Sequence, residues 1–135
     1  MHVNFSLEAD YTPTWNNNRD LPEGEQGKAH FSTMETADFL DLMDAFDRHE
    51  LSDGVVDTDK IDTKTSKELL KEVGRLLPKY VKITNFTLNG GVELTIEHVT
   101  KYAPFMQLGV ELLLECANRA VPTEADEGNS DAQPA

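Results

Sequence analysis

The sequence predicts an α+β fold, mainly a bundle of three to four helices with an N-terminal β-hairpin or strand pair and a second, smaller β-hairpin. Three observations predict it. Apolar residues recur at helical spacing in three segments, they alternate with polar residues at the start of the chain, and Asn89-Gly90 interrupts an apolar run. The 135 residues suffice for one ordinary hydrophobic core. We expect residues 1–121 to form a single domain and residues 122–135, which lack large apolar side chains, to form a disordered acidic tail.

The N-terminal part predicts two strands separated by a long loop. Val3, Phe5 and Leu7 alternate with polar residues, which predicts a strand over residues 2–8. Residues 10–27 are rich in Pro, Asn, Asp and Gly, which favour turns. Residues 28–31 predict a second strand, and the sequence leaves open whether the two strands pair within the chain.

A first helix is predicted from Thr33, as its N-cap, to about Arg48. Its apolar face consists of Phe39, Leu40, Leu42, Met43 and Phe46. Its opposite face carries Asp38, Asp41, Asp44 and Asp47. Residues 51–62 predict an acidic loop.

The second helix has the clearest pattern in the chain. Thr65 and Glu68 match a capping box, and Pro78 is expected to bend the last turn. One face is apolar: Leu69, Leu70, Val73, Leu76, Leu77 and Tyr80. The opposite face forms a basic stripe: Lys64, Lys67, Lys71, Arg75, Lys79 and Lys82.

The basic stripe allows three interpretations. It could dock an acidic partner through Lys67, Lys71 and Arg75, and these are candidate partner-binding residues. It could instead be a solvated helix face, as charged faces opposite an apolar stripe commonly are. It could also complement the acidic face of the first helix.

The last third predicts a hairpin and a final helical region. Residues 83–88 and 92–94 flank Asn89-Gly90-Gly91, a strong hairpin pattern. Thr95 is expected to cap a helical region from Ile96 to about Ala120, and Pro104 suggests two pieces joined near Tyr102-Ala103.

This final region carries a wide apolar arc, which covers more than half of the helical wheel. Its members are Ile96, Val99, Tyr102, Phe105, Met106, Leu108, Val110, Leu112, Leu113, Leu114 and Cys116. A surface helix needs only about 100° of apolar face for its own core, so we expect a partner to cover part of the arc. The candidate partner-binding residues are Phe105, Met106, Leu108, Leu112 and Leu113. The competing interpretation is a central core helix.

No catalytic, cofactor or metal constellation is predicted. In a calcium-loop register with Gly54 at the sixth position, His49, Leu51 and Lys60 fall where oxygen ligands are required. Four scattered histidines and one cysteine lack zinc-site spacing. Cys116 lies in an apolar helix, where a buried and inert thiol is expected.

Charge further limits the partners. The net charge is −13, with −10 in residues 1–60, +1 in residues 61–121 and −4 in residues 122–135. Nucleic acid and anionic membranes are poor partners for such a chain, because phosphate binding needs clustered Lys and Arg. The two halves should attract each other, within one chain or between copies in a homo-oligomer. Met1–Phe5 lacks the pattern of a signal peptide, and no apolar run is long enough to span a bilayer.

The pattern resembles the tail assembly chaperones of long-tailed, siphovirus-type bacteriophages. The resemblance lies in four segments: Tyr11–Pro22 followed by Glu25-Gln26, Leu76–Val81, Thr95–Val99 and the apolar helix Phe105–Leu114. It implies a protein of the host cytoplasm that binds the tape measure protein and recruits tail tube subunits, without catalytic residues or cofactors. Some members of that family have a longer form made by translational frameshift, and the acidic tail would fit the place where such a form diverges.

Two other classes remain as alternatives. One is a virion structural component, such as a head–tail or capsid accessory protein. The other is an acidic inhibitor or nucleic-acid mimic, whose carboxylates imitate phosphates. A small enzyme ranks below both for want of a catalytic motif.

Overall fold

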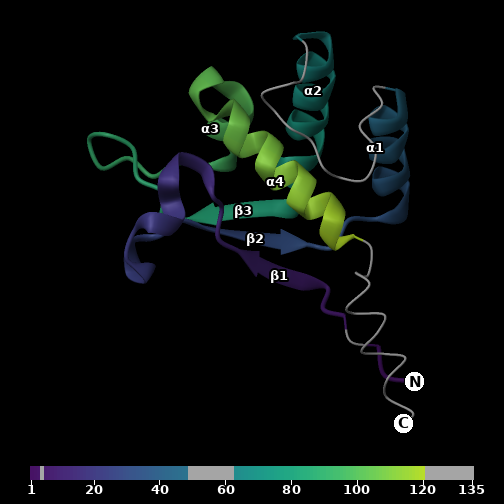
Figure 1. The fold of residues 1–135 in the computed structure, drawn as a ribbon, viewed down its shortest axis with the longest axis horizontal. Helices are drawn as coiled ribbons and strands as arrows, with labels where there is room; N and C mark the ends of the chain where they lie inside the picture. Colours follow the sequence, from purple (N-terminus) through teal and green to yellow (C-terminus); the bar gives the residue numbers. More distant parts are fainter. Residues whose placement is uncertain (4, 49–62, 121–135) are drawn as a thin grey trace.

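The computed structural model describes residues 1–3, 5–48 and 63–120, and it has an α+β fold (Figure 1). An antiparallel sheet has the strand order β1-β2-β3, with β1 at Glu8–Tyr11, β2 at Lys28–Ser32 and β3 at Val81–Thr84. The α-helices within these residues are α1 (Thr36–Arg48), α2 (Thr63–Tyr80), α3 (Ile96–Lys101) and α4 (Met106–Arg119). Three short 3-10 helices are η1 (Trp15–Asp20), η2 (Glu23–Glu25) and η5 (Ala103–Phe105). The α+β class is confirmed, and the helix count is slightly above the expected three to four once the short helices are included.

The N-terminal strands pair with each other, but the first begins later than predicted. Strand β1 spans Glu8–Tyr11 rather than residues 2–8, whereas β2 matches the predicted second strand. The register pairs Ala9 with Phe31 and Tyr11 with Ala29, so β1 places its partly buried side chains on the core side. Val3 and Leu7, predicted strand residues, are 55% and 73% exposed. The alternation continues through both segments, and pairing with the buried Phe31 selects the later one.

The predicted second hairpin is smaller than expected, because its first strand joins the main sheet. Val81–Thr84 pairs with β2, and Asn85 then leaves the sheet with φ of 64°. Beyond it, a single bridge joins Thr87 to Glu93. Gly90 and Gly91 have φ of 86° and 79°, so the positive φ falls on the two glycines.

The helix starts differ from the predicted caps. Helix α1 begins at Thr36, because the Thr33 hydroxyl instead donates a 2.9 Å hydrogen bond to the Leu7 carbonyl. Leu40, predicted on the apolar face of α1, is 59% exposed. Helix α2 begins at Thr63, ahead of the predicted cap, and contains Pro78 in its last turn as expected. The predicted loop at residues 51–62, the calcium-loop test and the predicted acidic tail all fall outside the described residues.

The break in the final helical region is confirmed. Helix α3 ends at Lys101, η5 contains Pro104, and α4 follows directly. Thr95 caps α3: its hydroxyl accepts from the His98 backbone N–H, and the His98 ring accepts from the Thr95 backbone N–H. His98 is therefore a capping residue of the first turn.

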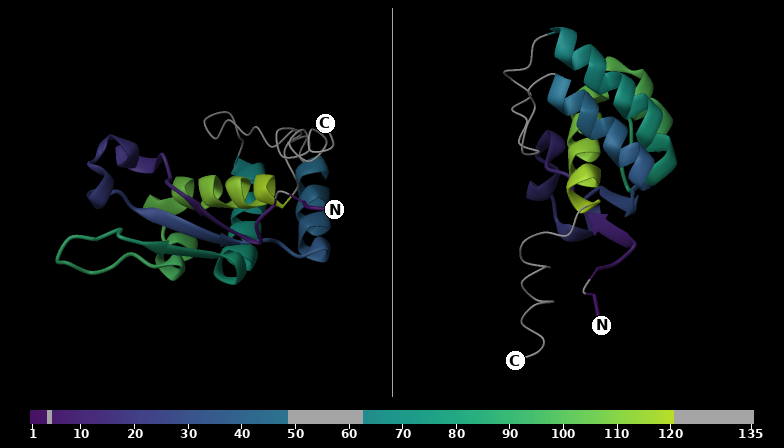
Figure 2. Two further views of the ribbon diagram at one scale, coloured as in Figure 1. Left: turned by 90° about the horizontal axis from the view of Figure 1, so that it is seen from below. Right: turned by 90° about the vertical axis from the view of Figure 1, so that its right-hand side faces the viewer.

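Helix α4 lies along one face of the sheet and is the centre of the core (Figure 2). It packs against α2, α3, β2 and η1. Leu108, Leu112 and Leu113 have no exposed surface. Gly109 lets α4 approach its neighbours closely, because an added Cβ would lie 3.1 Å from Val73 and 3.3 Å from Val99.

The long loop between β1 and β2 is closed around one buried amide. The Asn18 side-chain amide donates to the Pro13 and Gly27 carbonyls at 2.9 and 3.0 Å, and its oxygen accepts from the Gly27 N–H at 2.7 Å. Asn16 and Asn17 adopt positive φ, which asparagine tolerates better than most residues. This arrangement holds Gly27 directly beneath the Phe86 ring.

Replacing Gly27 by alanine should destabilise the fold. A Cβ at position 27 would overlap the Phe86 ring, so the ring must move, at a cost of about 1–3 kcal/mol. Urea unfolding would measure this loss. Gly24→Ala in the same loop is the matched control, since a Cβ there meets nothing within 4 Å. An equal effect of the two substitutions would contradict the close packing of Gly27 against Phe86.

Candidate functional site

The structure corrects the expectation that the apolar arc needs a partner to cover it. Leu108, Leu112 and Leu113 are fully buried, so they form core rather than a binding surface. Phe105 is half-buried, and Met106 remains 38% exposed. The competing interpretation, a central core helix, describes most of α4.

The apolar arc is buried because several elements pack against different parts of it. Strand β2 contributes Ala29 and Phe31, and α2 contributes Val73 and Leu77, all within the same buried cluster. A helical wheel shows the width of an apolar face, whereas the number of elements that cover it depends on the tertiary fold. The part left open is the junction of α3 and α4, where Tyr102 and Met106 are 49% and 38% exposed.

Two of the six bases of the basic stripe, Arg75 and Lys79, form ion pairs with acidic residues at the start of α1. Lys79 contacts Asp38 at 2.7 Å and Glu35 at 2.9 Å, and Arg75 contacts Asp38 at 3.2 Å. The predicted complementarity between the stripe and the acidic face of α1 is therefore confirmed for these two bases. Of the other candidate residues, Lys67 is exposed, and Lys71 lies 3.6 Å from Glu68 with its side chain 74% exposed.

Asp38 is the centre of this network. Its side chain is only 16% exposed, and it accepts hydrogen bonds from Lys79 and from the Tyr80 hydroxyl. These bonds, the one from Lys79 first, lower the pKa of Asp38 to about 2. Burial and the bond to Asp38 raise the pKa of Tyr80. The charged carboxylate is thus the form that joins α1 to α2.

The Asp38 contact should be lost in acid. Because the pKa of Asp38 is lower in the folded chain than its ordinary value of 3.8, its stabilising effect is complete above about pH 4 and disappears as the pH falls toward 2. Asp38→Asn should therefore be less stable than the unchanged protein at pH 6, with the difference shrinking between pH 4 and pH 2. Urea unfolding across this range would measure it. A constant difference would contradict the assignment.

A hydrogen-bonded row crosses the solvent side of the sheet. His30 Nδ1 lies 2.7 Å from Asp10, and His30 Nε2 lies 3.1 Å from the Thr84 hydroxyl. The order of groups is that of a hydroxyl–imidazole–carboxylate relay. The His30 and Asp10 side chains are 43% and 79% exposed, so water competes for every bond. We interpret the row as cross-strand pairing.

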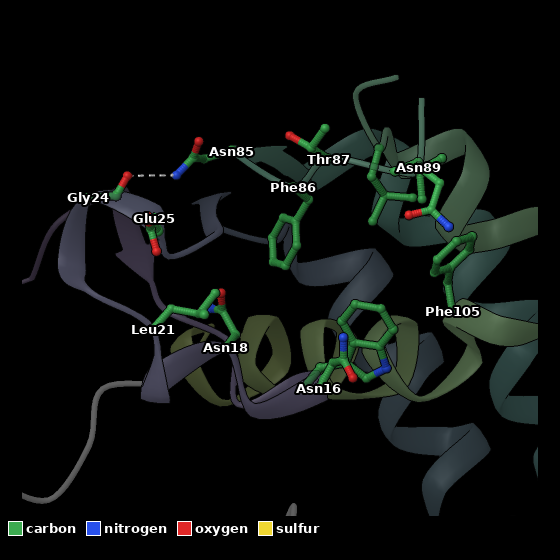
Figure 3. A pocket seen from close by; sticks show the side chains of 13 residues that line it. Asn16, Asn18, Leu21, Gly24, Glu25, Asn85, Phe86, Thr87, Asn89 and Phe105 are labelled. Atoms are coloured by element: carbon green, nitrogen blue, oxygen red, sulfur yellow. Dashed lines mark hydrogen bonds between the residues drawn. The ribbon is translucent and has the colours of Figure 1, made fainter. Parts of the chain in front are cut away.

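A pocket of about 580 Å³ lies between the long loop and the small hairpin (Figure 3). Its apolar lining comes from three parts of the chain: Trp15, Leu21, Phe86, Leu88, Leu94 and Phe105. Four asparagines add amide groups: Asn16, Asn18, Asn85 and Asn89. Figure 3 shows the Phe86 and Phe105 rings facing the same space, with Asn16 and Asn89 on opposite sides of it. Glu25 is the one charged residue of its lining within the described residues.

The walls of this pocket are fixed by contacts of the protein itself. The Trp15 ring packs 5.9 Å from Phe105 and 6.4 Å from Phe86, measured between ring centroids. The Asn85 amide donates to the Gly24 and Gln26 carbonyls at 3.2 and 3.0 Å, which ties the hairpin side to the loop side. Contacts within the protein therefore hold the pocket walls in place, as in small binding sites that are largely pre-formed.

Glu111 of α4 holds the N-terminal wall in place. Its carboxylate accepts hydrogen bonds from the Tyr11 hydroxyl at 2.6 Å and from the Thr14 hydroxyl at 3.0 Å. It also accepts from the backbone N–H groups of Thr14 and Trp15, at 2.7 and 3.0 Å, at the start of η1. Burial, together with the hydrogen bond to Glu111, raises the pKa of Tyr11.

Removing the Glu111 charge should loosen the pocket wall. Glu111→Gln loses the charge-assisted bonds, and we expect a loss of about 1–3 kcal/mol in unfolding free energy. Trp15 emission should shift to longer wavelength, because the tryptophan gains contact with water. Glu93→Gln, an exposed change in the hairpin, is the control and should alter stability by less than about 0.5 kcal/mol. Unchanged stability and emission in Glu111→Gln would refute the role of this carboxylate.

The sequence did not predict the pocket, but it did predict that the Cys116 thiol is buried. Trp15, Phe86 and Asn18 belong to no periodic pattern; the nearest local clue was a lone tryptophan within a turn-rich segment. Cys116 is 3% exposed, and burial raises its pKa to about 11, which fits the predicted inert thiol.

The function of the described residues has to be inferred from the geometry given above. Across residues 1–3, 5–48 and 63–120, no group of three His, Cys, Asp or Glu side chains could hold a metal ion. Within the same ranges, no helix is both long and apolar enough to cross a membrane. No family model, curated protein or solved structure matches the chain.

Proposed function

We propose that this protein is a non-enzymatic assembly chaperone of a long-tailed bacteriophage, which binds the tape measure protein and recruits tail tube subunits in the host cytoplasm. The proposal rests on the resemblance of four segments of the sequence and on one structural observation. That observation is an apolar segment left open at the junction of α3 and α4.

This open segment, residues 102–106, has the sequence Tyr-Ala-Pro-Phe-Met. Tyr102 and Met106 are 49% and 38% exposed, Ala103 and Pro104 are exposed, and Phe105 is half-buried. Exposed apolar residues that adjoin one another are typical of protein-binding surfaces, whereas scattered ones are common on any protein. The binding surface we propose is therefore much narrower than the arc the sequence predicted.

The charge of the chain supports the same proposal. A protein that binds an aggregation-prone client must itself stay soluble, and a net charge of −13 opposes self-association. Lys67 and Lys71 remain exposed on α2, so they could also meet an acidic partner.

Co-expression with the long helical product of a neighbouring gene tests the proposal. We expect the client to stay soluble and to elute with this protein as a complex. Changing Tyr102 and Met106 together to serine should weaken the complex at least tenfold, because the apolar contact area is lost. Leu40→Ser, an exposed leucine on α1, is the control and should leave the complex intact.

An insoluble client with no complex would refute the chaperone function. Mass spectrometry of purified particles then separates it from the alternative of a virion structural component. An assembly chaperone should be missing from mature virions, whereas a structural component should be present in them.

A further inference from the structure

The pocket bounded by Trp15, Phe86 and Phe105 carries chemistry that the proposed function does not yet use. We propose that it binds a peptide segment that presents a bulky apolar side chain flanked by lysine or arginine. This inference rests on the proposed function for its biological setting, since the client would supply the peptide, but the binding itself can be measured separately.

The apolar side chain is indicated by the walls. Phe86 and Phe105 face the same space, and Leu21, which also lines the pocket, is 46% exposed. A volume of about 580 Å³ is within the usual range for ligand pockets and exceeds what a single methyl or ethyl group would fill. Burial of a leucine or phenylalanine side chain against such walls is favourable, because it removes apolar surface from water.

The peptide backbone is indicated by two amides. The side-chain amides of Asn18 and Asn85 bond to the protein backbone, whereas those of Asn16 and Asn89 have no hydrogen-bond partner among the described residues. They lie on opposite sides of the pocket (Figure 3). A carboxamide carries both a donor and an acceptor, so it can pair with a peptide group in either direction.

The basic flanks are indicated by the charge of the two loops that form the pocket, of which Glu25 lines the cavity. The two loops that form the pocket, residues 15–25 and 85–94, contain the carboxylates of Asp20, Glu23, Glu25 and Glu93. All four residues are exposed. The one base in these loops, Arg19, donates to the Thr12 carbonyl and stacks over the Tyr11 ring, which directs it to the strand side. Glu25 in the lining, with the exposed carboxylates of the same two loops, therefore favours a cationic peptide over an anion.

The single tryptophan of the chain lines the pocket, so its fluorescence reports on binding. The probe is the capped hexapeptide Lys-Lys-Phe-Leu-Lys-Lys, which has no tryptophan of its own. We expect a saturable change in Trp15 emission and matching heat by calorimetry, both weakened by added salt. The same peptide with Glu in place of Lys should bind at least tenfold more weakly. A peptide with Gly in place of Phe-Leu should not saturate the signal.

Matched leucine variants locate the site. Leu21→Ala should weaken the lysine peptide roughly three- to tenfold, because part of the apolar wall is removed. Leu40→Ala, an equally conservative change at an exposed site on α1, should leave binding unchanged. Glu23→Gln combined with Glu25→Gln should reduce the salt dependence.

Three results would overturn the inference. The first is the lack of binding by both fluorescence and calorimetry. The second is equal weakening by Leu21→Ala and Leu40→Ala, which would place the contact elsewhere. The third is saturation by methyl glucoside without binding of the peptide, which would make the pocket a saccharide site. A client complex that forms while the peptide fails to bind would refute this inference alone, and peptide binding without a client complex would refute only the chaperone function.

Discussion

Burial of α4 is the constraint on which the rest of the structure depends. The helix is apolar around most of its circumference, and the chain satisfies it by placing the sheet, α2 and α3 around it. Gly109 allows a close approach to Val73 and Val99. The one acidic side chain that α4 directs at the N-terminal loop, Glu111, then fixes residues 11–15 and with them the wall of the pocket. Core packing and the candidate site therefore share one element.

The charged residues fall into two groups, one between α1 and α2 and the other in the loops that form the pocket. Around α1 and α2, opposite charges meet and neutralise one another, with Asp38 accepting bonds from more than one donor. In the loops that form the pocket, Glu25 lines the cavity, and the one base, Arg19, is turned toward the β1 side. Within the described residues, exposed carboxylates therefore lie in the same two loops as the partly exposed apolar side chains of the pocket.

The sequence predicted the helices well because their patterns are local. Pro78 in the last turn of α2, the break after Lys101 and the cap at Thr95 follow from the chemistry of single residues and their neighbours. Strand β1 was misplaced because the alternation continues on both sides of Glu8, and only pairing with Phe31 selects the register. The pocket could not be predicted, because Trp15, Phe86 and Phe105 meet through long-range contacts. The buried part of α4 was predicted to be a binding surface because a helical wheel does not show how many other elements pack against the helix.

The position of Trp15 has a practical consequence for studies of folding. Its indole packs against Phe86 of the hairpin segment and Phe105 of η5, and neither ring belongs to α1 or α2. Fluorescence thus follows closure of one end of the molecule, while far-ultraviolet circular dichroism is dominated by the helices. If the two signals change at the same urea concentration, the domain unfolds as one cooperative unit. If fluorescence changes first, the loop that Glu111 holds separates before the helical core opens.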